Sequence, residues 1–372
     1  MSATAPASIL SDATLESFRS RAAAYDRENR FFDDDFADLR KSGYLLMPIP
    51  KELGGLGMNL AEVCREQRRL AEYAPATALA TNMHLYWMGV AATLYQMGDT
   101  SCRWMLEEGA QGGVFAAGHA EAGNDLPALL STARAERVDG GYKFYGHKNF
   151  GSLTPVWTRF GLHAMDTSDP AAPKVVHAFM ARDTPGYTIK ETWDTLGMRA
   201  TRSDDTILEG AFVPDSNIPR VVPAGFAGVD LFVLGIFIWA MPTFGNIYLG
   251  IAKRAFEIAL TSARTKTSIA LGGKPMGFNP MVQYTVAEMA VELDAITAHL
   301  DRIADDWSNG VDLGGLLPAK LVAAKYHAVE GARRVAKLAL DVVGGAGIFK
   351  ANELERLLRD VTLGPVHPAN SL

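Results

Sequence analysis

The sequence has little cysteine and no concentration of one charge. Only Cys64 and Cys102 occur in 372 residues, which argues against a disulfide framework and fits a reducing compartment. The formal net charge is -6 and no block of basic residues occurs, so we expect no nucleic-acid partner. The histidines and cysteines lack the spacing of a metal site, and neither a nucleophile elbow nor a phosphate-binding P-loop is present.

Long apolar runs are also absent. The most apolar stretch, Leu231 to Met241, is far shorter than the ~20 residues that a membrane helix needs. Residues 1–12 contain no basic segment followed by an apolar one, so we expect no secretory signal. These absences predict a cytoplasmic protein without a membrane span. Hydrophobic residues make up 48% of the chain, enough for a large core, and the length predicts two or three domains.

The spacing of apolar residues divides the chain into three predicted domains, residues 1–112, 113–225 and 226–372. In the first, apolar residues recur at three- and four-residue steps, as from Leu15 to Phe18, which is typical of helices. In the second, short runs of alternating polarity between glycines and prolines predict strands. In the third, long amphipathic stretches predict four helices, whose lengths are typical of a bundle.

The predicted elements of the second and third domains can be located by residue. Asp139-Gly140-Gly141 lies between two alternating runs and predicts a hairpin. The predicted strands are residues 133–138, 142–145, 175–180, 187–191 and 206–213. The predicted helices of the bundle are residues 236–264, 280–307, 318–343 and 353–361. The expected fold is mostly α, with a helical N-terminal domain, a central barrel-like β-domain and a C-terminal four-helix bundle.

A motif near the C-terminus is the most informative feature. Gly344-Gly345-Ala346-Gly347 is followed by Glu355-Arg356 and by Arg359-Asp360, which close the last predicted helix. This arrangement resembles the C-terminal signature of the acyl-CoA dehydrogenase superfamily, whose order of domains also matches nearly the whole chain. The resemblance implies a bound flavin, FAD with FMN as the alternative. It also implies a homodimer or homotetramer, because relatives complete their flavin site from a second subunit.

The segment from Phe115 to Asp125 resembles the family's first flavin-contact strand and turn. The resemblance implies that Phe115, Ala117 and Gly118 lie along the flavin ring. It also implies that Asn124, in the place of the usual serine, borders the cofactor and the mouth of the substrate pocket. Without the resemblance, the same residues describe an ordinary strand that ends in an Asn-Asp turn.

The segment from Gly146 to Ser152 resembles the second flavin strand. Dehydrogenases commonly have Trp, Ile and Thr at its last three positions, where this chain has Phe150, Gly151 and Ser152. An aromatic residue followed two positions later by serine is similar to the flavin monooxygenase branch, in which the serine hydroxyl hydrogen-bonds the oxygenated flavin. The resemblance implies that Phe150 shields the ring and that Ser152 is both a flavin contact and a catalytic residue. A core Phe and a strand-end Ser are the alternative interpretation.

Two further regions match the family. Residues 195–214 resemble the frame of the β-domain, with its Leu-Gly-Met-Arg turn and its Val-Pro exit. Arg264 takes the place of an arginine that in relatives binds FAD pyrophosphate across a subunit interface, a task that suits the guanidinium fork. The resemblance implies that Gly344 and Gly345 let the backbone approach the ADP half of the cofactor closely.

The family's catalytic base is missing from both of its usual places. Counting from Arg359-Asp360 puts Pro368 where many dehydrogenases have a glutamate, and the alternative source, residues 237–241, contains no acid. His367 is the nearest titratable residue, and a His-Pro pair here resembles the monooxygenase branch. A neutral imidazole can act as a base near pH 7. His84 is predicted to face the same pocket, although an isolated histidine on an apolar helix is commonly structural.

The substrate pocket is less defined by the sequence. Tyr86, Trp87 and Trp239 are predicted to line it, and aromatic residues of this kind are equally typical of a helical core. His119 and His147 lie within the two flavin strands but match no role in the family, so they stay unassigned.

Three functions are compatible with these observations. The first, which we favour, is an oxygen-using flavin oxidoreductase that oxygenates a small organic molecule or a thioester; Phe150, Ser152, His367 and the missing glutamate support it. The second is an acyl-CoA dehydrogenase with an unusual base, which passes its electrons to a carrier protein. A hybrid would dehydrogenate a thioester and then oxygenate it. The third is a catalytically silent scaffold, the least favoured because the flavin-contact pattern is retained.

Overall fold

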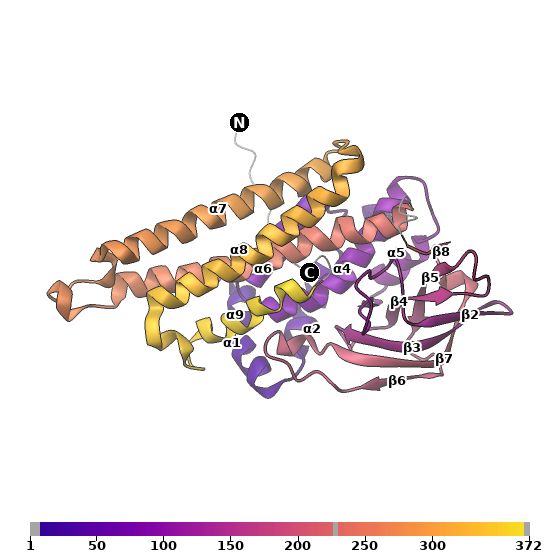
Figure 1. Cartoon of the computed structure of the whole chain (residues 1–372), viewed down its shortest axis with the longest axis horizontal. Coiled ribbons are helices and arrows are strands. Elements are labelled where there is room, and N and C mark those ends of the chain that lie inside the picture. Colours follow the sequence, from indigo (N-terminus) through magenta and orange to yellow (C-terminus); the bar gives the residue numbers. More distant parts are fainter. Residues whose placement is uncertain (1–7, 226–229, 368–372) are drawn as a thin grey trace.

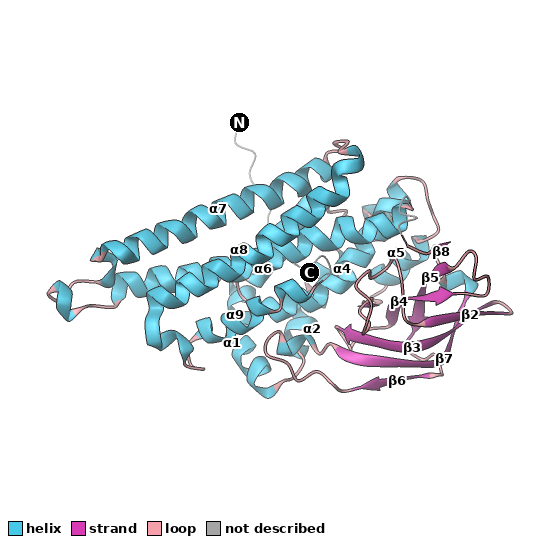
Figure 2. Cartoon of the chain, in the orientation of Figure 1, coloured by secondary structure: helices cyan, strands magenta, loops and turns pink. Residues whose placement is uncertain are grey.

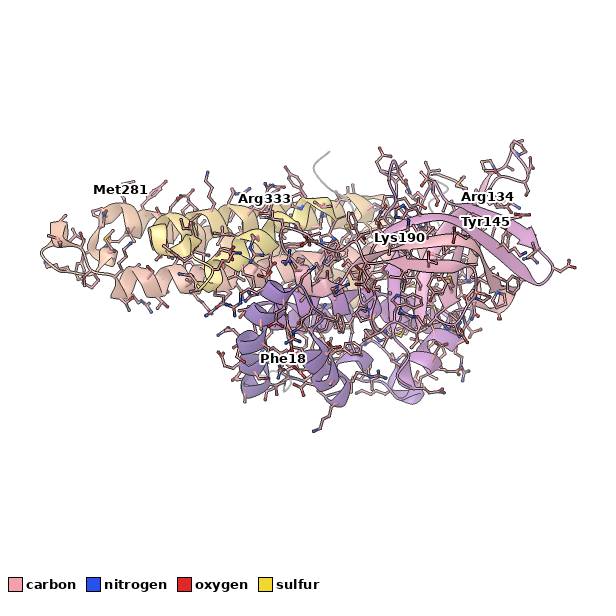
Figure 3. All side chains as sticks on the ribbon, turned by 90° about the horizontal axis from the view of Figure 1, so that it is seen from below. Phe18, Arg134, Tyr145, Lys190, Met281 and Arg333 are labelled. Atoms are coloured by element: carbon pink, nitrogen blue, oxygen red, sulfur yellow. The ribbon has the colours of Figure 1, made fainter. Side chains whose placement is uncertain are left out.

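The computed structural model describes residues 8–225 and 230–367, which form an elongated helical body with a β-sheet at one end (Figures 1 and 2). Figure 3 places Arg134 and Tyr145 at the sheet end and Met281 at the opposite tip of the helical body. Helices come first, strands second and helices last along the chain. The predicted fold class is confirmed, while the division into three domains at residues 112 and 225 stays a prediction.

The N-terminal helices are α1 (Asp12–Glu28), α2 (Asp33–Lys41), α3 (Leu60–Ala71), α4 (Pro75–Gln96) and α5 (Arg103–Ala110). Local capping fixes two of their starts. The Ser11 hydroxyl accepts a hydrogen bond from the Thr14 N–H at 3.1 Å, and Asn59 and Glu62 cap α3 reciprocally. Helix α4 is buried along almost its whole length because α3, α6 and the strand β1 pack around it.

The strands are β1 (Phe115–Gly118), β2 (Arg134–Val138), β3 (Gly141–Gly151), β4 (Arg159–Asp166), β5 (Lys174–Ala181), β6 (Tyr187–Lys190), β7 (Asp204–Pro214) and β8 (Arg220–Pro223). They pair in the order β6-β7-β3-β2-β4-β5-β8, and β1 pairs with β4. The predicted hairpin is confirmed, because Val138 pairs with Gly141 across a turn in which Gly140 has a φ of 73°. The sequence pattern does not predict β4, which is buried on both faces and therefore lacks alternating polarity.

The C-terminal helices are α6 (Leu231–Thr265), α7 (Pro280–Ser308), α8 (Leu317–Val343) and α9 (Glu353–Thr362). They confirm the predicted bundle. Helix α6 begins before the predicted residue 236 because the Asp230 carboxylate caps it, accepting a hydrogen bond from the Phe232 N–H at 2.8 Å.

Helix α6 is the central helix of the bundle. By length and composition alone it is the one helix in the described ranges that could cross a membrane, but 83% of its most apolar window is buried inside the protein. Helices α3, α4 and α8 all pack against it. A helix that is surrounded on all sides needs apolar residues all round, so α6 is core.

Candidate active site

A cavity of about 500 Å³ lies where α4 and α6 meet the sheet. That volume is within the range of small-molecule and cofactor sites. Its wall is mostly apolar and comes from α4, the ends of β1 and β3, the loop after β1, residues 193–203, α6 and residues 363–367. Segments that are far apart in the sequence therefore build one site.

A bulge in β3 brings Phe150 to the cavity. The pairing of β3 with β7 changes register between Lys148 and Gly151, and Phe150 adopts a φ of 59°, a backbone conformation that is costly for a bulky residue. The bulge turns the Phe150 ring into the cavity wall, where it meets Trp193 edge to face at 5.9 Å between ring centroids. Bulges commonly redirect a side chain beside an active site.

A line of hydroxyl groups follows the bulge. The oxygen atoms of Ser152 and Ser203 are 2.7 Å apart, those of Ser203 and Thr201 are also 2.7 Å apart, and Thr201 donates to the Met198 carbonyl at 2.8 Å. Ser152, Ser203 and Thr201 all line the cavity. Because the Thr201 proton is committed to Met198, Ser203 donates to Thr201 and Ser152 donates to Ser203. Ser152 therefore keeps a lone pair that can accept a hydrogen bond from a bound group.

These features suit a flavin ring, which has one apolar edge and one polar edge. Ala117 and Phe150 supply apolar wall, and the hydroxyls of Ser152 and Ser203 supply polar partners. Phe115 is fully buried behind that wall and Gly118 lies next to it, where the Phe160 ring would clash with any larger side chain. Of the predicted contacts on β1, the structure therefore brings Ala117 to the cavity surface.

The C-terminal motif holds in place the wall segment that carries Thr201 and Ser203. The Asp360 carboxylate accepts a hydrogen bond from the Met198 N–H at 2.6 Å, and Arg359 forms a bidentate pair with Asp26 at 2.9 and 2.6 Å. Gly197 packs directly on the backbone of Arg359, where a side-chain carbon would come within 2.5 Å. The Arg-Asp pair thus fixes the Leu-Gly-Met-Arg turn, and Met198 lines the cavity.

Replacing Asp360 by alanine is expected to lower the free energy of unfolding by about 1–3 kcal/mol, because the buried Met198 N–H loses its acceptor. Asp360→Asn keeps an acceptor oxygen and is the matched control. Burial, partly opposed by Arg356, raises the pKa of Asp360 to about 6, so its stabilising contribution falls as the pH rises from the unfolded value of 3.8 through 6. Urea unfolding at pH 3.8 and at pH 6 would measure the loss in each variant and its change with pH. Equal losses of unfolding free energy in Asp360→Ala and Asp360→Asn would contradict a role for the hydrogen bond to Met198.

His367 lies at the cavity, as predicted for the base. Its ring stacks on Phe244 at 4.8 Å between centroids, and the Lys325 ammonium holds its backbone by donating to its carbonyl at 2.9 Å. The Nε2 atom is buried and has no hydrogen-bond partner among the described residues. Burial, followed by the charge of Lys325, lowers the pKa of His367 to about 3, so the imidazole is neutral near pH 7. Pro368, the position of the missing glutamate, lies outside the described residues.

His84 does not reach the cavity. Its Nε2 is 3.1 Å from the Leu45 carbonyl, and its Nδ1 accepts the Phe115 N–H at 3.2 Å. Both ring nitrogens are therefore occupied by backbone, and burial lowers the pKa of His84 to about 4. This placement supports the structural interpretation: His84 joins α4 to β1 and to the segment before α3.

The predicted pocket aromatics separate into two groups. Tyr86 lines the cavity. Trp87 instead donates from Nε1 to the Ala116 carbonyl at 3.1 Å, and Trp239 donates to the Thr93 hydroxyl at 2.9 Å. Both indoles are buried and absent from the cavity wall, so the structure places them in the core behind it.

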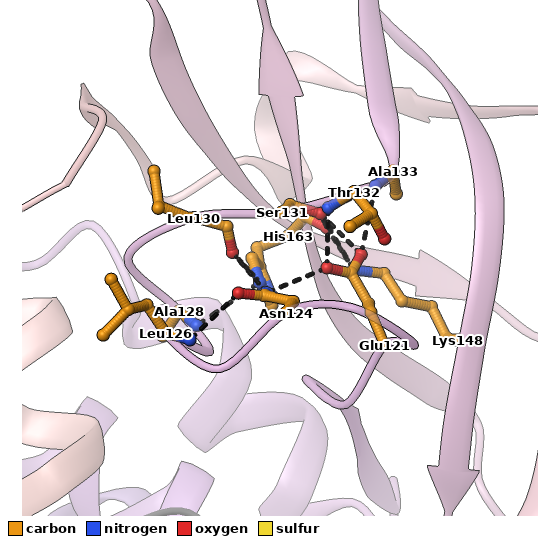
Figure 4. A network of polar contacts seen from close by, with 10 residues as sticks. All are labelled: Glu121, Asn124, Leu126, Ala128, Leu130, Ser131, Thr132, Ala133, Lys148 and His163. Carbon is orange, nitrogen blue, oxygen red and sulfur yellow. Dashed lines mark hydrogen bonds and ion pairs between the residues drawn. The ribbon is translucent and has the colours of Figure 1, made fainter.

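Asn124 lines the cavity, but its amide mainly holds the loop that follows β1. It donates to the Leu130 carbonyl at 2.7 Å and to Glu121 at 3.0 Å, and its oxygen accepts the Leu126 N–H (Figure 4). An Asx side chain that bonds the backbone two residues on is typical of a tight turn. Asn124 therefore shapes the mouth of the pocket.

Arg264, Gly344 and Gly345 do not contribute to this cavity. Arg264 is exposed at the end of α6 and the glycines follow α8, in the part of the bundle that points away from the sheet (Figure 1). Within one copy of the chain they are not part of the cavity wall. Their predicted contact with a cofactor bound to a second subunit stays a prediction.

A buried ion pair in the cavity wall was not among the predicted site residues. Lys148 and Glu121 are paired with no side-chain exposure, and Glu121 also accepts hydrogen bonds from Ser131, Thr132 and Ala133 (Figure 4). The sequence contains a signal for it. In β3 every second residue from Tyr142 points inward, so alternation alone places Lys148 on the buried face, where a lysine requires an acidic partner.

Comparisons with known proteins identify the family of the chain. The N-terminal domain model of acyl-CoA dehydrogenases matches residues 11–103 and the C-terminal domain model matches residues 243–371. The chain is 32% identical to the amino sugar nitrososynthase DnmZ of Streptomyces peucetius, over 96% of this chain and 87% of that protein. It is 28% identical to the putative acyl-CoA dehydrogenase YdbM of Bacillus subtilis, over 95% of this chain and 90% of that protein.

A solved structure also matches this chain over nearly its whole length. KijD3 in complex with FMN and dTDP-3-amino-2,3,6-trideoxy-4-keto-3-methyl-D-glucose superimposes with a TM-score of 0.79 at 27% identity, over 95% of this chain and 86% of KijD3. The matches cover the helical parts, the sheet and the cavity between them. The chain therefore belongs to the acyl-CoA dehydrogenase family, and it is a flavin oxidoreductase.

Proposed function

We propose that this protein uses a bound flavin and molecular oxygen to oxygenate a small amine. The observation that carries the proposal is that the described residues of the cavity wall include no free carboxylate. Among the described residues that line it, the acids are Glu121 and Asp125. Glu121 is neutralised by Lys148 and Asp125 is exposed on the turn. A buried, unpaired carboxylate is well suited to abstract the α-proton of a thioester, and these residues do not supply one.

The described residues fit the oxygen-using reaction instead. In this proposal Ser152 would hydrogen-bond the flavin, and His367 would offer a neutral imidazole that takes up or returns a proton. Apolar side chains of α4 and α6 line the cavity, and an apolar lining slows the wasteful decay of a reactive oxygen species. When bound, the flavin supplies the electrons and the oxygen chemistry.

The relatives support an amine as the substrate class. DnmZ is named as an amino sugar nitrososynthase, and the KijD3 structure contains FMN and an amino sugar nucleotide. Oxygenation of an amine balances as reduced flavin (FMNH⁻), O₂, a proton and R–NH₂ giving FMN, R–NHOH and water. The amine needs no carboxylate base, because its nitrogen lone pair is the nucleophile.

The test supplies the purified protein with reduced FMN or reduced FAD, oxygen, and a panel of amino sugars and simple amines. We expect a hydroxylamine or nitroso product. A parallel arm mixes the FAD-loaded protein with acyl-CoA thioesters without oxygen. Flavin bleaching with an enoyl-CoA as product would show the dehydrogenase activity instead, and a protein that binds neither flavin would exclude both functions.

Ser152→Ala is expected to divert the reaction from product to hydrogen peroxide by at least tenfold, because the flavin loses the hydroxyl that holds its oxygen-bearing edge. The measurement is the ratio of peroxide to oxygenated product. Ser168→Ala, on an exposed turn beyond β4, is the control and should leave the ratio unchanged. An unchanged ratio in Ser152→Ala would remove this residue from the reaction.

We also propose that the protein is a cytoplasmic homo-oligomer. Several apolar side chains at the far end of the bundle are exposed, including Phe278, Met281, Tyr284, Ile348 and Phe349. They lie in the same region as Arg264 and Gly344, which are predicted to reach a neighbouring flavin site. Light scattering during size-exclusion chromatography would measure the mass, and a monomer would contradict the proposal.

A further inference from the structure

Helices supply a part of the cavity wall that contains no strand. Helix α4 contributes Leu79, Met83 and Tyr86, which are four and three residues apart and therefore lie on one face of the helix. Helix α6 packs against α4 and contributes Ala240 and Phe244, four residues apart on one of its faces. We call the residues of α4, α6 and 363–367 that line the cavity the helical wall. In the proposed function the strands hold the flavin, so the helical wall is left to the substrate.

The helical wall carries two polar groups that have no partner within the protein. All its other side chains are hydrocarbons or methionines. The Tyr86 side chain is buried, and its hydroxyl forms no hydrogen bond with any described residue. The His367 Nε2 atom also has no partner among the described residues. Because buried polar atoms are nearly always paired, these two groups are available to a bound molecule.

The helical wall offers no charged partner to a ligand. The described residues of the whole cavity wall include no arginine or lysine, and residues 1–7, 226–229 and 368–372 contain no charged side chain in the sequence. The acids of the cavity lie elsewhere: Glu121 is paired with Lys148, and Asp125 is exposed on the turn after β1. On the helical wall a phosphate would therefore lack a cation, and an ammonium group would lack a carboxylate.

Such a wall favours an amine that is neutral at pH 7. An alkyl amine resembles the lysine side chain, whose pKa is about 10.4, so on the order of one molecule in 10³ is neutral at pH 7. The ammonium form has no lone pair with which to bond oxygen, and its burial without a carboxylate is costly. In an aromatic amine the lone pair is conjugated with the ring, which makes the nitrogen far less basic. The aromatic amine is therefore neutral at pH 7.

The helical wall also favours an aromatic ring over a sugar. The Phe244 ring stacks on the His367 imidazole at 4.8 Å between centroids, and Met83 offers a polarisable sulfur. Aromatic rings pack favourably against both kinds of side chain. A sugar brings several hydroxyl groups, and each hydroxyl that is buried without a partner costs free energy. Two polar groups suffice for one amino group but not for several hydroxyls as well.

We infer that the helical wall is the binding site of an aromatic amine, with the Tyr86 hydroxyl and His367 Nε2 as the polar partners of its amino group. The inference rests on the proposed function and names its substrate class. The tyrosine oxygen accepts one N–H, and Nε2 accepts the other in the imidazole tautomer that is protonated at Nδ1. The nitrogen lone pair then stays free to react.

The reaction balances for this substrate. FMNH⁻, O₂, H⁺ and Ar–NH₂ give FMN, Ar–NHOH and water. The nitrogen lone pair forms the N–O bond while the O–O bond breaks, and the four electrons that oxygen gains come in pairs from the flavin and from the amine. His367 takes the proton that the nitrogen loses, and that proton ends in the water molecule.

The first test compares aniline with cyclohexylamine, an alkyl amine whose ring has the same number of atoms, and with glucosamine. The purified protein receives saturating reduced FMN, oxygen and one of the three amines, and product formation gives kcat/KM. At pH 7 we expect the value for aniline to exceed the other two by at least tenfold. Between pH 7 and 9 the value for cyclohexylamine should rise about tenfold per pH unit with its neutral fraction, whereas that for aniline should stay nearly constant.

The second test removes the Tyr86 hydroxyl and measures binding by calorimetric titration of the protein in oxidised FMN. Tyr86→Phe should weaken the binding of aniline roughly fivefold, the effect expected of one lost hydrogen bond. Toluene, which lacks the amino group, should bind the variant and the wild type equally. Tyr145→Phe is the matched control, because its ring packs on Arg134 in the sheet and is not part of the cavity wall; it should bind aniline as the wild type does.

These outcomes separate the aromatic-amine site from the proposed function. Faster oxygenation of cyclohexylamine or glucosamine than of aniline at pH 7 would overturn the site and leave amine oxygenation in place. If no amine were oxygenated, the proposed function would fail and binding alone would decide on the site. Tighter binding of aniline than of cyclohexylamine, weakened in Tyr86→Phe, would then support the site, and any other result would overturn it.

Discussion

His367→Ala is expected to lower kcat by roughly 10²–10⁴-fold, the usual contribution of a positioned acid–base group. The imidazole is the titratable group that the loop after α9 brings to the cavity, and Phe244 and Lys325 fix its ring and its backbone. Flavin affinity should change little, because the proposed flavin contacts, Ala117, Phe150 and Ser152, come from strands and from the segment after β3 rather than from the loop after α9. The measurement is turnover of the amine substrate with saturating reduced flavin, beside a flavin titration.

The pH profile gives a second readout of His367. Because burial lowers its pKa to about 3, the neutral base is present at every pH above that value, and it is lost only as the pH falls through 3. The activity of the wild type should therefore show no acid limb from His367 between pH 5 and 8. Thr362→Ala, at an exposed position at the end of α9 that is not part of the cavity wall, controls for disturbance of the loop. Equal losses of turnover and of flavin affinity in His367→Ala would show a structural role instead.

The sequence predicts the fold well because the informative signals are local. Hairpin glycines, helix periodicity and the Glu355 to Asp360 motif each need only a few neighbouring residues. The function of that motif is not local, because Asp360 accepts a hydrogen bond from Met198, which lies 162 residues earlier in the chain. The motif identifies the family, but only the folded chain shows that it fixes a wall of the cavity.

The errors in the predicted pocket come from helices that are buried all round. Helix α4 has no polar face, so its periodicity cannot tell whether Tyr86, Trp87 or His84 points to the cavity or to the core. In the structure Tyr86 lines the cavity, whereas His84 and Trp87 form hydrogen bonds with the backbone of β1. Trp239 on α6 is placed in the core for the same reason, because other helices cover α6 on several sides.

The contact between His119 and His163, whose ring centroids are 5.2 Å apart, depends on strand register, which sequence alone does not determine here. His119 follows a strand that is parallel to β4, and parallel partners are joined by long connections rather than by a readable turn. Strand β4 is buried on both faces, so a search for alternating polarity does not predict it. A residue such as His119 can therefore be placed in a flavin strand from its sequence while its neighbours stay unknown.

Lys148→Met is expected to lower the free energy of unfolding by about 3–5 kcal/mol, the usual effect of removing one partner of a buried ion pair. The loss would be a large part of the total stability, which for most domains is about 5–15 kcal/mol. Burial lowers the pKa of Lys148 to about 8 despite its acidic partner. For Glu121 the balance is reversed: burial acts to raise its pKa, but Lys148 and the hydrogen bonds outweigh it and hold the pKa below its usual value. Without the ammonium, that carboxylate would remain buried and uncompensated.

The double variant Glu121→Gln/Lys148→Met should recover much of that loss. The N–H groups of Thr132 and Ala133 bond different oxygens of Glu121, and glutamine keeps an acceptor oxygen for one of them. No buried charge remains, so the cost of desolvating a charge disappears. Glu136→Gln, which breaks the exposed pair with Arg134, is the matched control and should change stability by less than about 1 kcal/mol. Urea unfolding measures these variants together with Glu121→Gln alone. If the double variant were as unstable as the two single changes added together, the two side chains would have no energetic coupling, which would contradict mutual neutralisation.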